Sequence, residues 1–221
     1  MKTSALTLGL WTLSLLTATA GEPDVIFQDD FKGKLADGWT WVREDPKAWR
    51  VTEDGLEVRL QPGNMWGGAN NAKNVLVRPV PDPAKQPLEV SVTVSNKPTE
   101  QYEQVDLVWY YDDSHQIKIG QEQVDKVLCL VMGREEKDQT RTIAKIPIEA
   151  LRLEVRFLVS GDSLKGQYRP AGEKEWKDAG GCTLPVKGEP KISLQVYQGP
   201  ANAERWGTFT AFKIVKGKSG Q

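Results

Sequence analysis

The sequence predicts an all-β fold, a two-sheet antiparallel β-sandwich. Short segments in which apolar and polar residues alternate recur along the chain, and no long segment has the periodicity of a helix. Turns rich in glycine, proline and aspartate separate these segments, and the 221 residues include 20 glycines and 13 prolines. Many short strands without helices between them are typical of sandwiches.

The expected strands begin soon after residue 20 and continue almost to the end of the chain. In order, they are 25–27, 39–43, 49–52, 55–60, 74–79, 88–94, 105–111, 116–122, 126–132, 141–146, 151–160, 163–169, 192–198 and 206–215. Turns of favourable composition separate them, among them 53–55 and 61–63. Because no repeat or linker interrupts the series, residues 21–221 are predicted to form one domain.

The clearest hairpin covers residues 105–122. Leu107 and Trp109 share one face of its first run, and its second run alternates in the same way around Lys118. An aspartate-rich break at 112–115 joins the two runs, as expected for a β-hairpin. Because the hairpin also carries bulky and charged residues such as Lys118 and Glu122, we expect one face to line a groove instead of meeting bulk water.

A second hairpin covers residues 151–169. Its first run alternates polar residues with an apolar series, which is expected to face the core. The apolar series is Leu151, Leu153, Val155, Phe157 and Val159. Gly161 and Asp162 then supply a turn before the returning run.

Residues 1–20 have the composition of a signal peptide. Lys2 supplies a positive charge, residues 8–16 form a short apolar core, and residues 17–20 end in the small-residue pattern that precedes cleavage. We therefore expect a secreted or periplasmic protein with no membrane attachment after cleavage. An uncleaved anchor is the alternative, although the apolar core is short for a membrane span.

The charge pattern argues against nucleic acid as a partner. The sequence has 29 basic and 30 acidic residues, a formal net charge of −1, and no run of five or more basic residues. Such a balanced composition provides no strong electrostatic attraction for nucleic acids or anionic membranes.

Two cysteines, Cys129 and Cys182, occur in this chain, which is expected to be exported. A disulfide between them would stabilise the fold by about 2–4 kcal/mol. The other interpretation is two separate buried thiols that behave as small apolar side chains. With one histidine in the sequence, the cysteines do not make a persuasive zinc site.

Several fragments occur in an order shared with a known group of sandwich domains. They are 27–31, 35–44, 49–51, 54–58, 66–68, 74–76, 102–113 and 209–214. In order and spacing they resemble the concanavalin A-like (jelly-roll) domains of the bacterial "regulation of enolase"-like family and the C-terminal domain of family-43 β-xylosidases. The resemblance covers nearly all of residues 21–221 and implies two curved antiparallel sheets, often found in carbohydrate-active proteins. The chain departs from the pattern at Val105 and Asp106, where relatives usually have small residues.

The resemblance also implies a structural calcium ion near the start of the domain, because related sandwiches often hold one there. Asp29 and Asp30 could supply one or two of the roughly six to eight oxygen ligands that calcium prefers. The closing motif, however, has Thr210 and Ala211 where relatives often carry an aspartate, which removes a ligand. The alternative is that the N-terminal carboxylates cap backbone amides in a turn.

Trp66 is the leading candidate for ligand binding. It precedes Gly67 and Gly68, and Asn70 and Asn71 follow. On such a loop a tryptophan can expose the flat face on which sugar rings dock, while asparagine side chains offer donors and acceptors to hydroxyl groups. The alternative is that Trp66 folds over the sandwich edge as a lid on the core.

A second group of candidates is associated with the 105–122 hairpin. If these residues face a concave sheet, they form a polar floor beneath two aromatic stacking platforms. The floor residues are Gln104, Lys118 and Glu122, the platforms are Trp66 and Trp109, and Arg43 is a further candidate. The alternative is an ordinary solvated sheet face, on which Lys118 and Glu122 make a modest cross-strand pair.

The sequence does not predict a catalytic site. Glycosidases usually place two carboxyl groups beside the scissile bond, but no strand carries the closely spaced acidic residues of sandwich glucanases. Glu122 and Asp125 are three residues apart, which would place them on opposite faces of an extended strand. The only histidine, His115, is expected to be exposed in a turn, and no serine-nucleophile, zinc or phosphate-loop motif is present.

The sequence therefore favours a secreted, non-catalytic module that binds a glycan or oligosaccharide, with no cofactor apart from the calcium ion considered above. Two alternatives stay open. One is a hydrolase of an unusual saccharide that uses Glu122 with a carboxylate from a loop, an idea based on analogy between folds. The other is an extracellular protein-interaction or structural domain without a small-molecule site.

Overall fold

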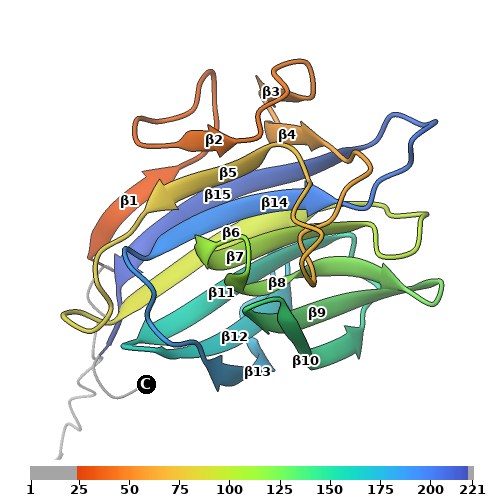
Figure 1. Ribbon diagram of the computed structural model, residues 1–221. Helices are drawn as coiled ribbons and strands as arrows, with labels where there is room; N and C mark the ends of the chain where they lie inside the picture. The colour runs from red at the N-terminus through yellow and green to blue at the C-terminus, as the bar shows by residue number, and fades with distance from the viewer. Residues whose placement is uncertain (1–23, 219–221) are drawn as a thin grey trace, which may run out of the picture.

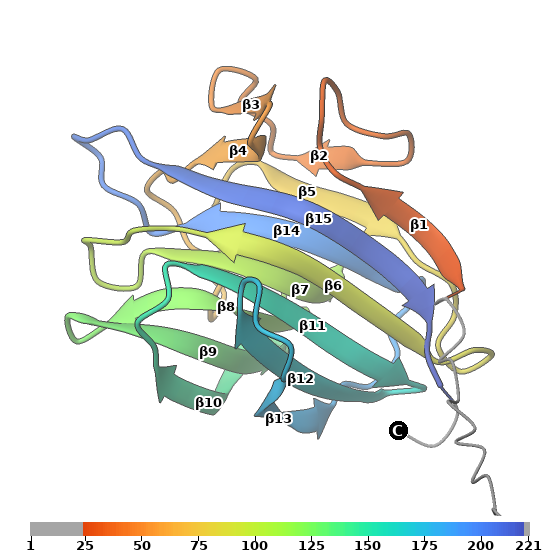
Figure 2. The ribbon, with the colours of Figure 1, turned by 180° about the vertical axis from the view of Figure 1, so that it is seen from behind.

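The alternating segments of the sequence pair into two antiparallel sheets that pack face to face (Figures 1 and 2). The computed structural model describes residues 24–218, so the expected signal peptide, residues 1–20, lies outside the described residues. The all-β prediction is confirmed, because the described elements are all strands. No helix within residues 24–218 has the length and apolar character needed to cross a membrane.

The eight-stranded sheet has the order β13-β12-β11-β6-β15-β4-β3, and β1 also pairs with β15. Its strands are β1 (Val25–Asp29), β3 (Trp49–Thr52), β4 (Gly55–Arg59), β6 (Leu88–Ser95), β11 (Arg152–Ser160), β12 (Ser163–Pro170), β13 (Lys177–Thr183) and β15 (Trp206–Lys216). Since β6 lies between β11 and β15, segments distant in sequence are hydrogen-bonded neighbours.

The seven-stranded sheet has the order β10-β9-β8-β7-β14-β5-β2. Its strands are β2 (Thr40–Val42), β5 (Val75–Pro79), β7 (Gln104–Asp112), β8 (His115–Val124), β9 (Val127–Glu136), β10 (Gln139–Pro147) and β14 (Lys191–Tyr197). The predicted 105–122 hairpin is the pair β7 and β8, which occupies the middle of this sheet.

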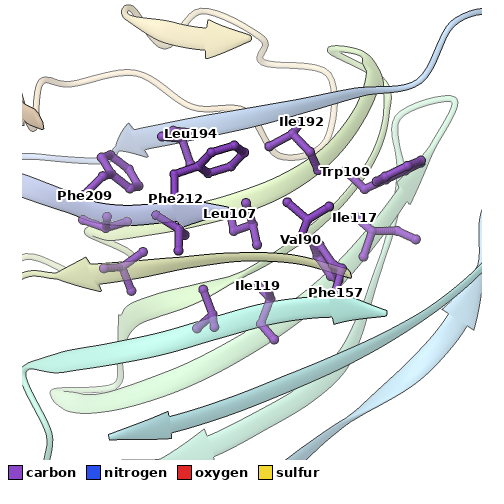
Figure 3. Close-up of a cluster of buried hydrophobic side chains, with 14 of the residues drawn as sticks. Val90, Leu107, Trp109, Ile117, Ile119, Phe157, Ile192, Leu194, Phe209 and Phe212 are labelled. Carbon is purple, nitrogen blue, oxygen red and sulfur yellow. The ribbon is translucent and has the colours of Figure 1, made fainter. Parts of the chain in front are cut away.

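The main core lies between the sheets (Figure 3). Val90 and Phe157 reach it from the eight-stranded sheet, and Leu107 and Ile119 reach it from the seven-stranded sheet, all fully buried. Burying one such side chain is worth about 1.5–3 kcal/mol. A register slip of one residue would turn a whole strand's apolar series outward, so the alternation fixes which face of each strand is internal.

A bulge in β15 explains how two aromatic residues three positions apart both reach the core. Phe209 and Phe212 would point to opposite faces of a regular strand, yet both are fully buried. The register of β15 against β6 shifts between Thr210 and Lys213, and Ala211 has a φ of 52°. The extra residue in the bulge therefore returns Phe212 to the core side.

The edge strand β13 is absent from the strands expected from the sequence. Its segment contains Gly180 and Gly181 and lacks an alternating apolar series, so only its pairing with β12 makes it a strand. It carries Cys182, while Cys129 lies on β9 of the other sheet, and both thiols are free. The disulfide considered from the sequence is therefore not formed.

Asp29 organises the start of the domain. Its Oδ1 accepts the backbone N–H of Phe31 at 2.8 Å, and its Oδ2 accepts the N–H of Ala36 at 2.9 Å and the indole N–H of Trp39 at 3.0 Å. Trp39 also packs edge-on against Phe212, with ring centroids 5.0 Å apart. The carboxylate thus fastens the chain after β1 to the aromatic cluster at β15.

These contacts are the ones that the capping interpretation of Asp29 predicts, and the calcium ion stays a prediction. Three N–H donors converge on the carboxylate oxygens that a cation would use, and Asp30 is exposed. Within residues 24–218, no group of three or more histidine, cysteine, aspartate or glutamate side chains is placed to hold a metal ion. The capping interpretation therefore accounts for Asp29.

Asp29→Ala is expected to lower the free energy of unfolding by about 1.5–3 kcal/mol, because hydrogen bonds to a charged group are lost and buried donors are left unpaired. Asp30→Ala is the matched control and should change it by less than about 0.5 kcal/mol. Urea denaturation of the three proteins measures both effects. A calcium-dependent rise in the midpoint that disappears in Asp29→Ala would contradict the capping role.

Candidate functional site

The outer face of the seven-stranded sheet carries a set of polar side chains that are nevertheless buried, called the polar face below. Its side chains alternate with those that enter the main core. At most 7% of each is exposed, and they are Gln104, Asp106, Gln116, Lys118, Glu122, Glu135, Ser193 and Gln195. The connection between β4 and β5 lies over part of this face (Figure 1), and residues 61–74 of it are called the cover segment below.

Apolar and polar contacts both hold the cover segment in place. Met65 is buried against Val108 and Tyr110 in a small cluster separate from the main core. The Gln116 amide donates to the Met65 carbonyl at 2.6 Å, and the Gly67 N–H donates to Glu135 at 3.1 Å. Burial raises the pKa of Glu135 despite that N–H. The cover segment therefore seals one half of the polar face.

Arg43 belongs to this attachment and does not line the cavity described next. Its guanidinium donates to both carboxylate oxygens of Asp113, at 2.6 and 3.2 Å, and its Nε donates to the Ala72 carbonyl at 2.7 Å. Paired N–H donors on one carboxylate are a strong and directional arrangement. The expected placement of Arg43 beside the other ligand candidates is wrong, because its donors are committed to the cover segment and Asp113.

A cavity of about 700 Å³ opens beside the cover segment, next to Asn64 and Trp66. Four of the six ligand candidates line it, namely Trp66, Gln104, Lys118 and Glu122. The other lining residues are Asn64, Tyr102, Val124, Asp125, Val131, Thr142, Lys145 and Gln198. Its volume lies in the range of small-molecule sites, and its lining combines aromatic rings with a few convergent polar groups, as such sites do.

Lys118 organises the floor of the cavity. Its ammonium donates to Gln104 Oε1 and to Glu122 Oε2, the latter at 2.8 Å, and all three side chains are at most 7% exposed. The same ammonium lies 4.9 Å from the centroid of the Trp66 ring, which is a cation–π distance. The floor therefore has a fixed arrangement of donors and acceptors next to an aromatic wall.

Trp66 reaches its position because Gly133 leaves room for it. Gly133 lies opposite Lys118 in the β8–β9 pair, and a Cβ atom there would clash with the six-membered ring of Trp66. The half-buried indole therefore lies over the sheet and forms one wall of the cavity.

Asp106 lies on the same sheet face as the floor residues and is missing from the sequence candidates. It is fully buried, and neither carboxylate oxygen has a hydrogen-bond partner among the described residues. Burial raises the pKa of Asp106 to about 7, with a further rise caused by Glu122 and an opposing effect of Lys118. The sequence did contain a signal that Asp106 belongs to the site. Alternation along β7 puts Leu107 on one face and puts Asp106 on the opposite face with Gln104.

Trp109 is not a stacking platform. It is 1% exposed and lies in the main core, where Figure 3 draws it beside Ile117. The expectation contradicts the alternation of β7, because Trp109 shares its face with Leu107 and the opposite face carries Gln104. The ring contributes to stability and is out of reach of a ligand in the cavity.

Two further expectations from the sequence are wrong. His115 is the first residue of β8 and is 6% exposed, with its Nδ1 3.4 Å from Asp112 and 3.2 Å from the Lys187 ammonium. Asp125 does not continue β8 but starts the turn to β9 with a φ of 53°, so strand alternation does not apply to it. As a result, Glu122 and Asp125 line the same cavity.

The two packed antiparallel sheets and the family match place the chain in the concanavalin A-like class. Residues 28–188 match the family described as the β-xylosidase C-terminal concanavalin A-like domain, and the chain belongs to this family. The resemblance to the C-terminal domain of family-43 β-xylosidases is thereby confirmed. No curated protein sequence matches the chain.

Solved structures with a similar fold come from several organisms. The GH43 protein BlXynB from Bacillus licheniformis has a TM-score of 0.73 and 20% identity, over 85% of this chain and 39% of that one. A xylan β-1,4-xylosidase from Bacillus halodurans has a TM-score of 0.72 and 16% identity, over 89% of this chain and 40% of that one. A functionally unknown protein from Saccharomyces cerevisiae has a TM-score of 0.66 and 14% identity, over 82% of this chain and 98% of that one. At these identities the likeness shows the fold alone, and the chain spans about two fifths of the two bacterial proteins.

Gly133→Ala is expected to cost about 1–3 kcal/mol of unfolding free energy in the wild type, because the added methyl group displaces the Trp66 ring. In the Trp66→Ala background the same change should cost much less, so a double-mutant cycle measures the contact. Gly181→Ala, whose nearest contact would be the Leu164 carbonyl oxygen at 3.1 Å, is the control strand glycine. Equal costs of Gly133→Ala in the two backgrounds would refute this placement of Trp66.

Asp106 is expected to make stability depend on pH. With its pKa raised to about 7, the Asp106 carboxyl group keeps its proton up to about pH 7 in the folded protein. In the unfolded chain it loses that proton near the ordinary pKa of 3.8. The stability due to the protonated group is therefore complete below about pH 4 and is lost as the pH rises through about 7. Asp106→Asn resembles the protonated group, so its stability relative to wild type should rise by roughly 2–4 kcal/mol between pH 4 and pH 8.

Urea denaturation of both proteins at the two pH values measures this difference. The contributions of groups that titrate in the same way in both proteins cancel when the two are compared. A difference that stays constant with pH would show that Asp106 has an ordinary environment.

Proposed function

We propose that this chain is a non-catalytic glycan-binding module and that the ligand enters the cavity beside Trp66. The observation that carries this proposal is the placement of an aromatic wall next to the fixed Gln104–Lys118–Glu122 floor. A sugar ring has apolar C–H surface on its faces and hydroxyl groups at its edge. The wall suits the first and the floor suits the second.

The floor is suited to hydroxyl groups in particular. The Glu122 carboxylate can accept a hydrogen bond, and the Lys118 ammonium can donate one, so a single hydroxyl can satisfy both. Gln198 adds an amide group to the lining, whereas the Asn64 amide is hydrogen-bonded to the backbone of Met65 and Trp66. Because Lys118 and Glu122 already neutralise each other, a neutral sugar suits the floor better than a strongly charged ligand.

The family supports the same ligand class. The similar structures include a xylan β-1,4-xylosidase and a GH43 protein from a Bacteroides ovatus xyloglucan system. We propose that plant-wall glycans of these kinds are the first ligands to test and that residues 1–20 direct the export of the module to them. The activity of the larger relatives is not transferred to a chain that spans about two fifths of their length.

A hydrolase is the second candidate, and the observation that favours it is that Glu122 and Asp125 line one cavity. Each carboxylate is paired with a lysine, Glu122 with Lys118 at 2.8 Å and Asp125 with Lys145 at 4.0 Å. Glycoside cleavage needs one carboxyl group that can give a proton to the leaving oxygen. Since Glu122 is held by Lys118 in the floor and the Asp125 side chain is 77% exposed in a long pair, binding is the function that the geometry supports better.

Trp66→Ala is expected to weaken glycan binding roughly tenfold or more, because stacking on the indole and the cavity wall are lost together. Glu122→Gln should weaken it less, since one acceptor remains. A glycan array followed by titration calorimetry measures both variants against wild type. Trp176→Ala is the matched control, because that indole lies between Arg156 and Arg169 on the other sheet.

The other functions predict different results in the same experiment. Release of reducing sugar by wild type, lost in Glu122→Gln, would establish a hydrolase. Failure of the folded wild type to bind any glycan on the array would overturn the proposal in favour of a protein-interaction or structural domain. Equal loss of binding in Trp66→Ala and Trp176→Ala would show that the cavity is not the site.

A further inference from the structure

We propose that the cavity binds the end of a glycan chain and excludes internal segments of a long chain. This inference rests on the proposed function, since it names the part of a glycan that the site takes. Two walls limit the cavity, one along the strands at Trp66 and one across β14, and its other sides are open.

Trp66 closes the direction along the strands. The indole lies over Gly133, in the middle of the polar face. The polar face continues beyond it through Gln116 and Glu135, but both side chains are buried and hydrogen-bonded to the cover segment. A sugar chain that follows the strands from Glu122 therefore has to stop at Trp66.

The cover segment closes the direction across β14. Gln198, directly after β14, donates its backbone N–H to the Gly63 carbonyl at 3.1 Å. Gly199 donates to the Gln61 carbonyl at the same distance. These two main-chain bonds join the segments into a continuous wall, and Tyr197 beneath them is 1% exposed. A ligand cannot cross this side without breaking them.

The cavity is open to solvent at the strand ends, beside the turn between β8 and β9, and towards β10. Tyr102 is 48% exposed there, and the side chains of Asp125 and Lys145 are also largely exposed on the rim. A chain that enters here places its terminal unit against Trp66 and its next unit beside the Tyr102 ring. The volume of about 700 Å³ suits a short oligosaccharide end, within the range of small-ligand pockets.

The buried floor adds a chemical reason for selecting a chain end. A terminal sugar has a free hydroxyl where an internal sugar has a glycosidic oxygen, which cannot donate a hydrogen bond. Lys118 and Glu122 are buried and hydrogen-bonded to each other, so one hydroxyl placed against the pair can accept from Lys118 and donate to Glu122. A blocked end can still accept from Lys118 but has no hydrogen to donate to Glu122, so it loses one of the two hydrogen bonds.

The experiment is titration calorimetry of the full chain with oligosaccharides of increasing length, from monosaccharide to hexasaccharide, for every glycan class that binds on the array. Affinity should change by less than about threefold between disaccharide and hexasaccharide, because the added units remain in solvent. Methylation of the terminal hydroxyl at one end of the disaccharide should weaken binding by about tenfold or more, and a methyl group at the other end should not.

Tyr102→Ala separates the two sugar positions. It should lower the affinity for the disaccharide by several-fold and leave that for the monosaccharide unchanged, because the Tyr102 ring contacts the second unit alone. Val186→Ala, at an exposed side chain that does not line the cavity, is the matched control and should leave both affinities unchanged.

Affinity that climbs more than about tenfold from disaccharide to hexasaccharide, or that survives methylation at both ends, would overturn the chain-end inference and leave the proposed function standing. Equal loss of monosaccharide and disaccharide affinity in Tyr102→Ala would also contradict it. Absence of binding to every glycan on the array would overturn the proposed function itself, and the inference with it.

Discussion

The buried polar face of the seven-stranded sheet is the constraint on which the candidate site depends. Polar side chains away from water cost free energy unless they find hydrogen-bond partners, and this face is satisfied only in part, since both Asp106 oxygens lack a partner among the described residues. Gln116 and Glu135 find partners in the backbone of the cover segment, while Lys118 joins Gln104 to Glu122. The cavity lies next to the cover segment, where the polar side chains bond to one another instead of to the backbone of that segment.

The cover segment links the fold to the site. Its position requires Arg43 and Asp113 on one side, the Gly133 gap beneath Trp66, and main-chain bonds to the segment after β14 on the other. These contacts come from parts of the chain that are distant in sequence. Asp106 shows the cost of the arrangement, because a carboxyl group fully enclosed beneath such a floor is held more easily in its neutral form.

Alternation in the sequence predicted most of the sandwich because burial of apolar side chains fixes the faces of a strand. It placed Leu107 and Ile119 in the core and Lys118 on the opposite face, and the structure has this arrangement. It failed for β13, whose glycines carry no face preference and which is a strand only through its pairing with β12. It also did not reveal the bulge at Ala211, since the pairing of β15 with β6 determines it.

The fold class, the likeness to the β-xylosidase C-terminal domain and the type of residue that lines the cavity could be predicted from the sequence, since they follow from local periodicity and ordered motifs. Which of the candidates meet depends on long-range packing. Trp66, Gln104, Lys118 and Glu122 share a cavity, Arg43 is drawn to Asp113, and Trp109 is enclosed between the sheets. The physical reason is that a side chain's access to a ligand depends on the path of a loop over the sheet, and long-range contacts, not local sequence, set that path.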